Sequence, residues 1–214
     1  MMTRDEKDVF CKLVAALVAP PDDNLMADLK QEGLRAFLVD GFGQWAAEPP
    51  ASDALFGEMD SKELDELQRT YDRLFGQYGE KRVSLVESTY KPWTRDDKCG
   101  MVFAKSKGLI MGDSAVHLLD VYERLSLEVP EVFRSTPDHL ILELEFLALL
   151  YREGTFEQIH RFIEDHLDWI PDLVDAVERA DPDPFYKSAI ELIHIFLQNE
   201  KKNERDSHEK KKIH

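Results

Sequence analysis

The stretch that decides the fold is TPDHLILELEFLALLY, residues 136–151. Apolar residues point in almost every direction when this segment is wound as a helix, and a helix that is apolar all round lies inside a protein. Glu143 and Glu145 stand in its middle, and because an unpaired buried carboxylate is costly, each needs a partner. The spacing offers His139 to Glu143 and Arg152 to Glu145. We therefore predict a buried central helix in which Glu143, Glu145 and Arg152 belong to a structural network.

Helix boundary signals occur at both ends of this segment and recur along the chain. Asp138 stands where an N-cap belongs, and Gly154 follows the last turn. Apolar spacing and start signals also predict helices over 5–18, 34–46, 61–75 and 113–127, and from Thr155, Pro171 and Asp183 onward. No run alternates with period two, so no strand is predicted. The predicted fold class is all-α, a globular multi-helix bundle.

The expected details differ along the chain. In the helix over 113–127 we expect Val116, Leu119 and Tyr122 to be buried, and in the helix after Thr155 we expect Phe156 to face the core. Residues 76–112 are rich in glycine and carry no helical pattern, and an irregular stretch of this length is usually functional.

The domain organisation follows from a change in composition near the C-terminus, where charged residues replace apolar ones. Residues 1–199 read as a single all-helical domain. Residues 200–214 hold six bases, four acids and one strongly apolar residue, Ile213, which predicts a frayed helix end that runs into a disordered tail.

Charge and composition disfavour several partner classes. The chain has 27 Lys and Arg residues against 43 Asp and Glu residues, a net charge of −16, so nucleic acid is a poor partner and a cationic partner a better one. No apolar run approaches the roughly 20 residues that a membrane span needs. The N-terminus lacks an apolar signal core, and the two cysteines form no CxxC pair, so we expect a protein of the cytoplasm without a zinc or disulfide framework.

No catalytic or metal motif stands out. Glu157–His160 and Glu191–His194 have the Glu-x-x-His spacing of di-iron bundles. Helical angles place Glu191 and His194 opposite the apolar face of their helix, Glu157 well off the face of its own helix and His160 at the edge of that face, so no metal site is predicted. No phosphate-binding loop or nucleophile elbow occurs. Two alternatives stay open at this point: a helical scaffold protein, and a small enzyme with His139 and Glu143 as an acid–base pair.

Six elements of the sequence, in order, resemble the redox enzyme maturation chaperones of the TorD/DmsD/NarJ type. The most specific is Pro137-Asp138-His139-Leu140 followed by Glu143-Leu144-Glu145-Phe146, which resembles the family's P-D-H and E-x-E-F elements. The others are Tyr71-x-x-Leu74-Phe75, Glu87-Ser88-x-Tyr90, Gly112 with Tyr122, His166-Leu167-x-Trp169-x-Pro171 and Pro184-Phe185-Tyr186. The likeness covers roughly residues 71–197, and Ser126 stands where a glycine is common in the family.

This resemblance implies a non-enzymatic cytoplasmic chaperone. Such proteins bind the apo catalytic subunit of a molybdopterin oxidoreductase, often at its twin-arginine signal peptide, and hold it until its cofactor is inserted and export can follow. The sequence does not name the client. The resemblance also implies a monomer or a domain-swapped dimer with a hinge at 126–137, no cofactor, and at most weak GTP binding.

The site residues come from the same resemblance. Asp138, His139 and Pro137 match family positions implicated in leader binding, and Leu74 and Phe75 match its apolar side, with Glu87 and Ser88 in the neighbouring element. We add Tyr90 and Trp93 by their position in the irregular stretch. The expected site is a groove between the 61–93 region and the Pro137 helix. Replacing Asp138 and His139 by alanine is expected to weaken leader binding and leave the fold mostly intact.

Overall fold

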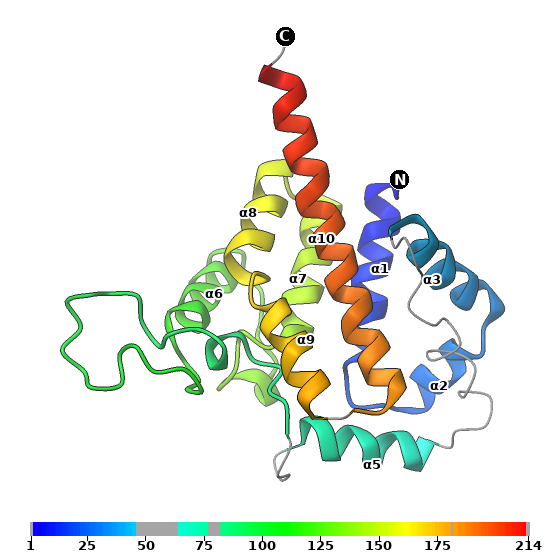
Figure 1. The fold of residues 1–214 in the computed structure, drawn as a ribbon, viewed down its shortest axis with the longest axis horizontal. Helices are drawn as coiled ribbons and strands as arrows, with labels where there is room; N and C mark the ends of the chain where they lie inside the picture. Colours follow the sequence, from blue (N-terminus) through cyan, green and yellow to red (C-terminus); the bar gives the residue numbers. More distant parts are fainter. Residues whose placement is uncertain (1, 46–63, 77–81, 181, 213–214) are drawn as a thin grey trace.

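The computed structural model describes residues 2–45, 64–76, 82–180 and 182–212 (Figure 1). The N-terminal part contains α1 (Arg4–Leu17), α2 (Asp23–Leu29), α3 (Glu32–Trp45) and α5 (Leu64–Phe75). The C-terminal part contains α6 (Asp113–Arg124), α7 (Leu140–Glu153), α8 (Phe156–His166), α9 (Ile170–Arg179) and α10 (Pro184–Lys212). Within these ranges the other regular elements are short 3₁₀ turns, η1 (Glu87–Thr89) and η2 (Glu131–Phe133), and one isolated β-bridge. The predicted all-α class is confirmed.

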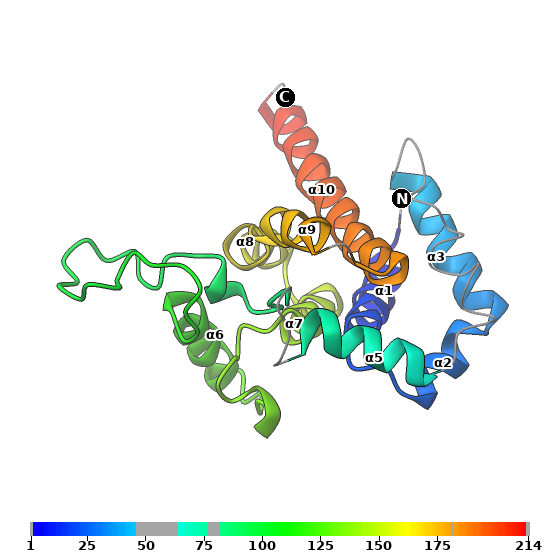
Figure 2. The same cartoon turned by 60° about the horizontal axis from the view of Figure 1, so that its bottom comes forward.

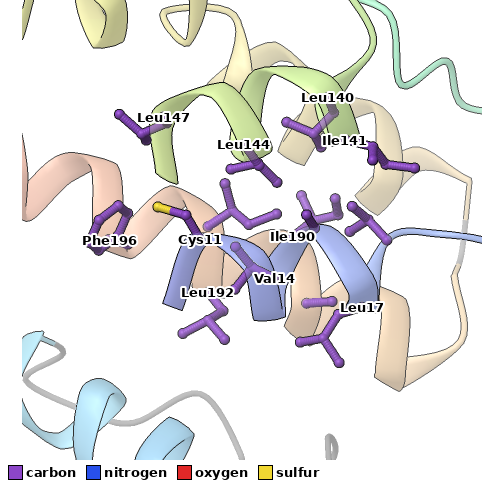
Figure 3. Close-up of a cluster of buried hydrophobic side chains, with 14 of the residues drawn as sticks. Cys11, Val14, Leu17, Leu140, Ile141, Leu144, Leu147, Ile190, Leu192 and Phe196 are labelled. Carbon is purple, nitrogen blue, oxygen red and sulfur yellow. The ribbon is translucent and has the colours of Figure 1, made fainter. Parts of the chain in front are cut away.

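The core forms where α1, α7 and α10 meet (Figure 3). Val14 of α1, Leu144 of α7 and Ile193 of α10 are completely or almost completely buried there, and Phe10 of α1 packs against Phe196 of α10 at 4.7 Å between ring centroids. In α7 every residue from Leu140 to Leu144 is buried. The prediction that residues 136–151 form the buried centre of the fold is therefore confirmed.

Local capping chemistry explains several helix starts. Thr3 and Thr155 each form a capping box, with Glu6 and Gln158 respectively, as the Thr155 signal predicted. Asp22 accepts from the Leu25 amide and starts α2, a short helix that the sequence analysis did not predict. The predicted cap of the 61–75 helix lies outside the described residues.

The expected buried faces of two helices were wrong at single positions. Val116 is 57% exposed and Leu119 only half-buried, whereas Ala115, Leu118 and Tyr122 form the buried face of α6. Phe156 of α8 is 55% exposed, at the first turn of its helix. In both cases the apolar pattern predicted the helix and part of its buried face, since Tyr122 of α6 and Ile159 and Ile163 of α8 are buried, but not every side chain that the neighbouring elements cover.

The irregular stretch is confirmed over its described part. From residue 82 to Gly112 the one regular element is η1, and the segment before α6 projects from the helical body (Figures 1 and 2). Its projecting part carries exposed apolar side chains at Met101, Val102, Phe103 and Ile110.

The predicted end of ordered helix at residue 199 is too early. Helix α10 continues to Lys212, where the sequence predicted a disordered tail. Glu200 anchors the first turn beyond residue 199, because it is buried, pairs with Lys7 of α1 at 2.7 Å and accepts a hydrogen bond from the Tyr151 hydroxyl at 2.7 Å. In the described part of the chain no helix is long and apolar enough to cross a membrane.

Candidate functional site

Residues 84–88, here called the strap, cross the start of α7 in an antiparallel pairing. Val86 bridges His139, the Leu140 amide donates to the Leu85 carbonyl at 2.8 Å, and the Glu87 amide donates to the Asp138 carbonyl at 2.9 Å. The structure thus brings together two sequence elements about fifty residues apart that were both predicted as site residues.

Asp138 holds the strap in place. Its side chain is completely buried, and its Oδ2 atom accepts a hydrogen bond from the Ser88 amide at 2.7 Å. Burial raises the pKa of Asp138 above its ordinary value, and the contacts with Ser88 oppose that rise. Ser88 and Pro137 are buried as well. These residues join two segments of the fold and offer no surface to a peptide.

His139, not Asp138, is the N-cap of α7. Its Nδ1 atom accepts from the Ile141 amide at 3.3 Å, and its ring packs against Phe133 at 4.9 Å between centroids. Burial lowers the pKa of His139 to about 4, so the ring is neutral at physiological pH and can accept that hydrogen bond.

Glu87 lies in a buried ion cluster with Lys91, His166 and Glu143. Lys91 Nζ contacts Glu87 Oε1 and also Asp168, and His166 Nδ1 lies 2.9 Å from Glu87 Oε2. Burial alone would raise the pKa of Glu87, but His166 and Lys91 together bring it below its ordinary value. Glu87 is therefore an ionised carboxylate with no exposed surface.

Glu143 is the neutral member of this cluster. Complete burial, the neighbouring Glu87 carboxylate and its hydrogen bond with Glu87 raise the pKa of Glu143 well above its ordinary value. The Trp169 indole donates to Glu143 Oε2 at 3.2 Å. The prediction that Glu143 needs a partner is confirmed, but the partners are Trp169 and Glu87 rather than the His139 ring. The proposed His139–Glu143 acid–base pair is not formed.

The cluster contains metal-ligand types without needing a metal. Donor atoms of Glu87, Glu143 and His166 lie within 4.8 Å of one another. The Lys91 ammonium balances one carboxylate and a proton neutralises the other, so the charge of the group is already compensated. His166 also lies 2.7 Å from the Nδ1 atom of His117, which extends the cluster to the surface of α6.

Tyr90 and Trp93, the two site residues added by their position in the irregular stretch, pack in different places. The Tyr90 hydroxyl donates to the Ser84 carbonyl at 2.8 Å, and its ring stacks on Trp169, so Tyr90 belongs beside the ion cluster. Trp93 packs against Phe103 within the projecting segment instead.

Leu74 and Phe75 close the end of α5. Leu74 is buried, and its carbonyl accepts from the Val83 amide at 2.7 Å, which leads the chain into the strap. Phe75 packs against Tyr71 and Tyr186 at 5.3 and 5.4 Å between ring centroids. Their apolar side chains contribute to the core near the strap.

The predicted Glu145–Arg152 pair does not form. Arg152 pairs with Glu153 at 3.0 Å, and both Glu145 and Arg152 are exposed. The α7 helix is thus buried on most of its circumference but not where Glu145 emerges, and only Glu143 belongs to an internal network.

Two hollows on the described surface lie around α6. A cavity of about 290 Å³, here called the apolar groove, lies between α6, α7 and α8 and is lined by Val121, Leu125, Phe146, Leu150 and Phe162 among others. A second cavity of about 200 Å³, here called the acidic pocket, is lined by Glu128, Glu145, Leu127, Leu142 and again Phe146. Sequence reasoning missed both, because each is formed by residues from separate helices.

Comparisons with known proteins agree with this architecture. The family model described as nitrate reductase delta subunit matches residues 22–175. The chaperone protein TorD of Vibrio parahaemolyticus is 24% identical over 182 residues, which are 77% of this chain and 78% of TorD. A crystal structure described as a redox enzyme maturation protein from Archaeoglobus fulgidus has the same fold, with a TM-score of 0.55 at 17% identity over 91% of this chain and 95% of its own. Since the family model covers most of the chain, the protein belongs to the nitrate reductase delta subunit family and is a TorD-like redox enzyme maturation chaperone rather than an enzyme.

Proposed function

We propose that this chaperone binds the apo catalytic subunit of a molybdopterin oxidoreductase at its twin-arginine signal peptide. It holds that subunit in the cytoplasm while the cofactor is inserted, and so delays export until the enzyme is complete. The chaperone itself needs no cofactor for this role, because its task is binding.

The observation that carries the proposal is an open apolar groove on the surface of a protein with a net charge of −16. A twin-arginine leader combines a cationic end with an apolar stretch. Apolar burial supplies affinity for the stretch, and the acidic surface attracts the arginines and excludes anionic partners. Family membership supports a reductase as the client, since the family model is named for a nitrate reductase subunit and the relative is named a chaperone.

The test is capture of the client from cells that express a molybdoenzyme. The tagged chain is used as bait in native extract, and the bound proteins are identified by mass spectrometry. We expect a molybdoenzyme precursor with its leader still attached.

Other outcomes separate parts of the proposal. Recovery of a nitrate-reductase-like subunit without a leader would keep the chaperone class and move the binding segment. Failure to recover any molybdoenzyme from cells in which one is detected would contradict the proposed client.

A further inference from the structure

The apolar groove and the acidic pocket flank one side chain. Phe146 of α7 lines both, and the chain between Leu125 and Leu127, at the end of α6, separates them. A peptide that fills one cavity and continues past residues 125–127 reaches the other. The molecule therefore offers an apolar site and an acidic site within the reach of one short segment.

The acidic pocket suits a guanidinium group. Glu128 and Glu145 both line it, and within the described residues neither carboxylate takes part in an ion pair. Leu127, Leu142 and Leu149 supply apolar walls for the methylene stem of an arginine. The pocket also lies beside the C-terminal end of α6, the negative end of the helix dipole, which favours a cation.

The apolar groove suits the stretch that follows the arginines. Leu125 is 53% exposed at its edge, and Phe146 and Phe162 form its floor. Two arginines line the apolar groove, and both are paired with acids. Arg124 pairs with Asp120 at 2.8 Å and Arg161 with Glu157 at 3.9 Å, so the groove is not strongly cationic. The groove can thus take apolar side chains without burying an unpaired arginine.

We propose that a twin-arginine leader binds across Phe146, with an arginine in the acidic pocket and its apolar stretch in the apolar groove. This inference rests on the proposed function. It places the leader on the surface of α6, α7 and α8 and assigns Asp138, Ser88 and Glu87 to the buried frame behind that surface. A second copy of the chain is a poorer occupant, because each copy carries a net charge of −16 and would bring like charge to Glu128 and Glu145.

The test is a calorimetric titration with two synthetic peptides. One carries two adjacent arginines before a leucine-rich stretch, and the other has alanine in place of both arginines. The titrated proteins are the wild type and a Glu128→Gln, Glu145→Gln double variant. Glu164→Gln is the matched control, since Glu164 is an exposed glutamate of α8 that lines neither cavity.

A second pair of variants tests the apolar groove. Leu125→Ser removes an exposed apolar side chain that lines the groove, and Val116→Ser removes one from the same helix that does not. All of these positions are exposed, so the variants are expected to fold, and circular dichroism checks this.

Each variant is expected to lose affinity only for the part of the peptide that its cavity binds. The double variant should bind the arginine peptide roughly tenfold more weakly and the alanine peptide unchanged. Leu125→Ser should weaken both peptides, and the Glu164 and Val116 controls neither. If the wild type prefers the arginine peptide and the double variant keeps that preference, the leader binds elsewhere and the proposed function stands. If the wild type binds neither peptide, or both equally, the proposed function fails together with this site.

Discussion

Asp138 occupies a motif position, and the structure places its side chain inside the fold. Its carboxylate is buried and accepts the Ser88 amide at 2.7 Å, so its removal leaves a buried donor without a partner. We expect Asp138→Ala to lower the free energy of unfolding by about 1–3 kcal/mol, measured by urea denaturation. This differs from the sequence-based expectation that the fold stays mostly intact.

A control separates this effect from loss of charge. Asp97→Ala, at an exposed aspartate paired with Lys105, should leave the free energy of unfolding close to that of the wild type. If Asp138→Ala unfolded as the wild type does yet lost leader binding, Asp138 would have to contact the leader directly.

His139 makes stability depend on pH. Burial lowers its pKa from the ordinary 6.5 to about 4, so between these values the unfolded chain binds a proton that the folded chain does not. Its contribution to stability is therefore complete above pH 6.5 and is lost as the pH falls toward 4. Between pH 7 and pH 5 this loss is about 2 kcal/mol.

The variant that checks this is His139→Asn, because asparagine keeps the N-cap and does not titrate. Urea denaturation at pH 7 and pH 5 should show a smaller fall in stability for the variant than for the wild type. Glu143 titrates in both proteins and cancels in the comparison. Equal falls would show that His139 is not the group responsible.

At the scale of elements, the start of α6 depends on a close approach between Gly112 and Trp93. The Trp93 carbonyl accepts the Asp113 amide at 2.9 Å, and a Cβ atom on Gly112 would lie 2.7 Å from the same oxygen. We expect Gly112→Ala to cost about 1–3 kcal/mol in the free energy of unfolding, because backbone on both sides must shift. Gly100→Ala, where a Cβ would meet nothing within 4 Å, is the control and should be near neutral. Equal stability of the two variants would contradict this close packing.

The comparison of sequence with structure is clearest in α7 and α6. Residues 136–151 are apolar on nearly all sides and were correctly predicted as a buried helix. For such a helix no single buried face has to be identified. The expected burial of Val116 in α6 was wrong. Val116 and Leu118 are both apolar, and only the neighbouring elements decide which of the two is covered. The sequence indicated that a buried Glu143 needs a partner. It did not indicate which one, because Glu87 and Trp169 lie far away in the sequence. The two cavities could not be predicted for the same reason, because their walls come from several helices that are distant in the sequence.

The connection between α6 and α7 begins with a backbone conformation that is typical of glycine. Ser126 adopts a φ of 55°, in the left-handed region that favours glycine. The hinge at 126–137 and domain exchange through it stay predictions.

At the scale of the whole molecule, Glu200 ties the C-terminal helix to the first and central helices. Its carboxylate contacts Lys7 of α1 and Tyr151 of α7. A chain that ends after Asn199 should unfold with about 2 kcal/mol less free energy than one that ends after Asn203, because Lys7 and Tyr151 lose a buried partner. Urea denaturation of the two chains measures the difference, and equal stabilities would show that α10 stops contributing at residue 199, as the sequence predicted.

The role in maturation is tested most directly by the cofactor content of the client. The captured oxidoreductase is purified from cells with and without the gene for this chain, and its bound molybdopterin is measured per mole of protein. We expect mostly empty enzyme in the absence of the chain and filled enzyme when the wild-type chain is restored. An equal filled fraction in both kinds of cell would contradict a role in maturation.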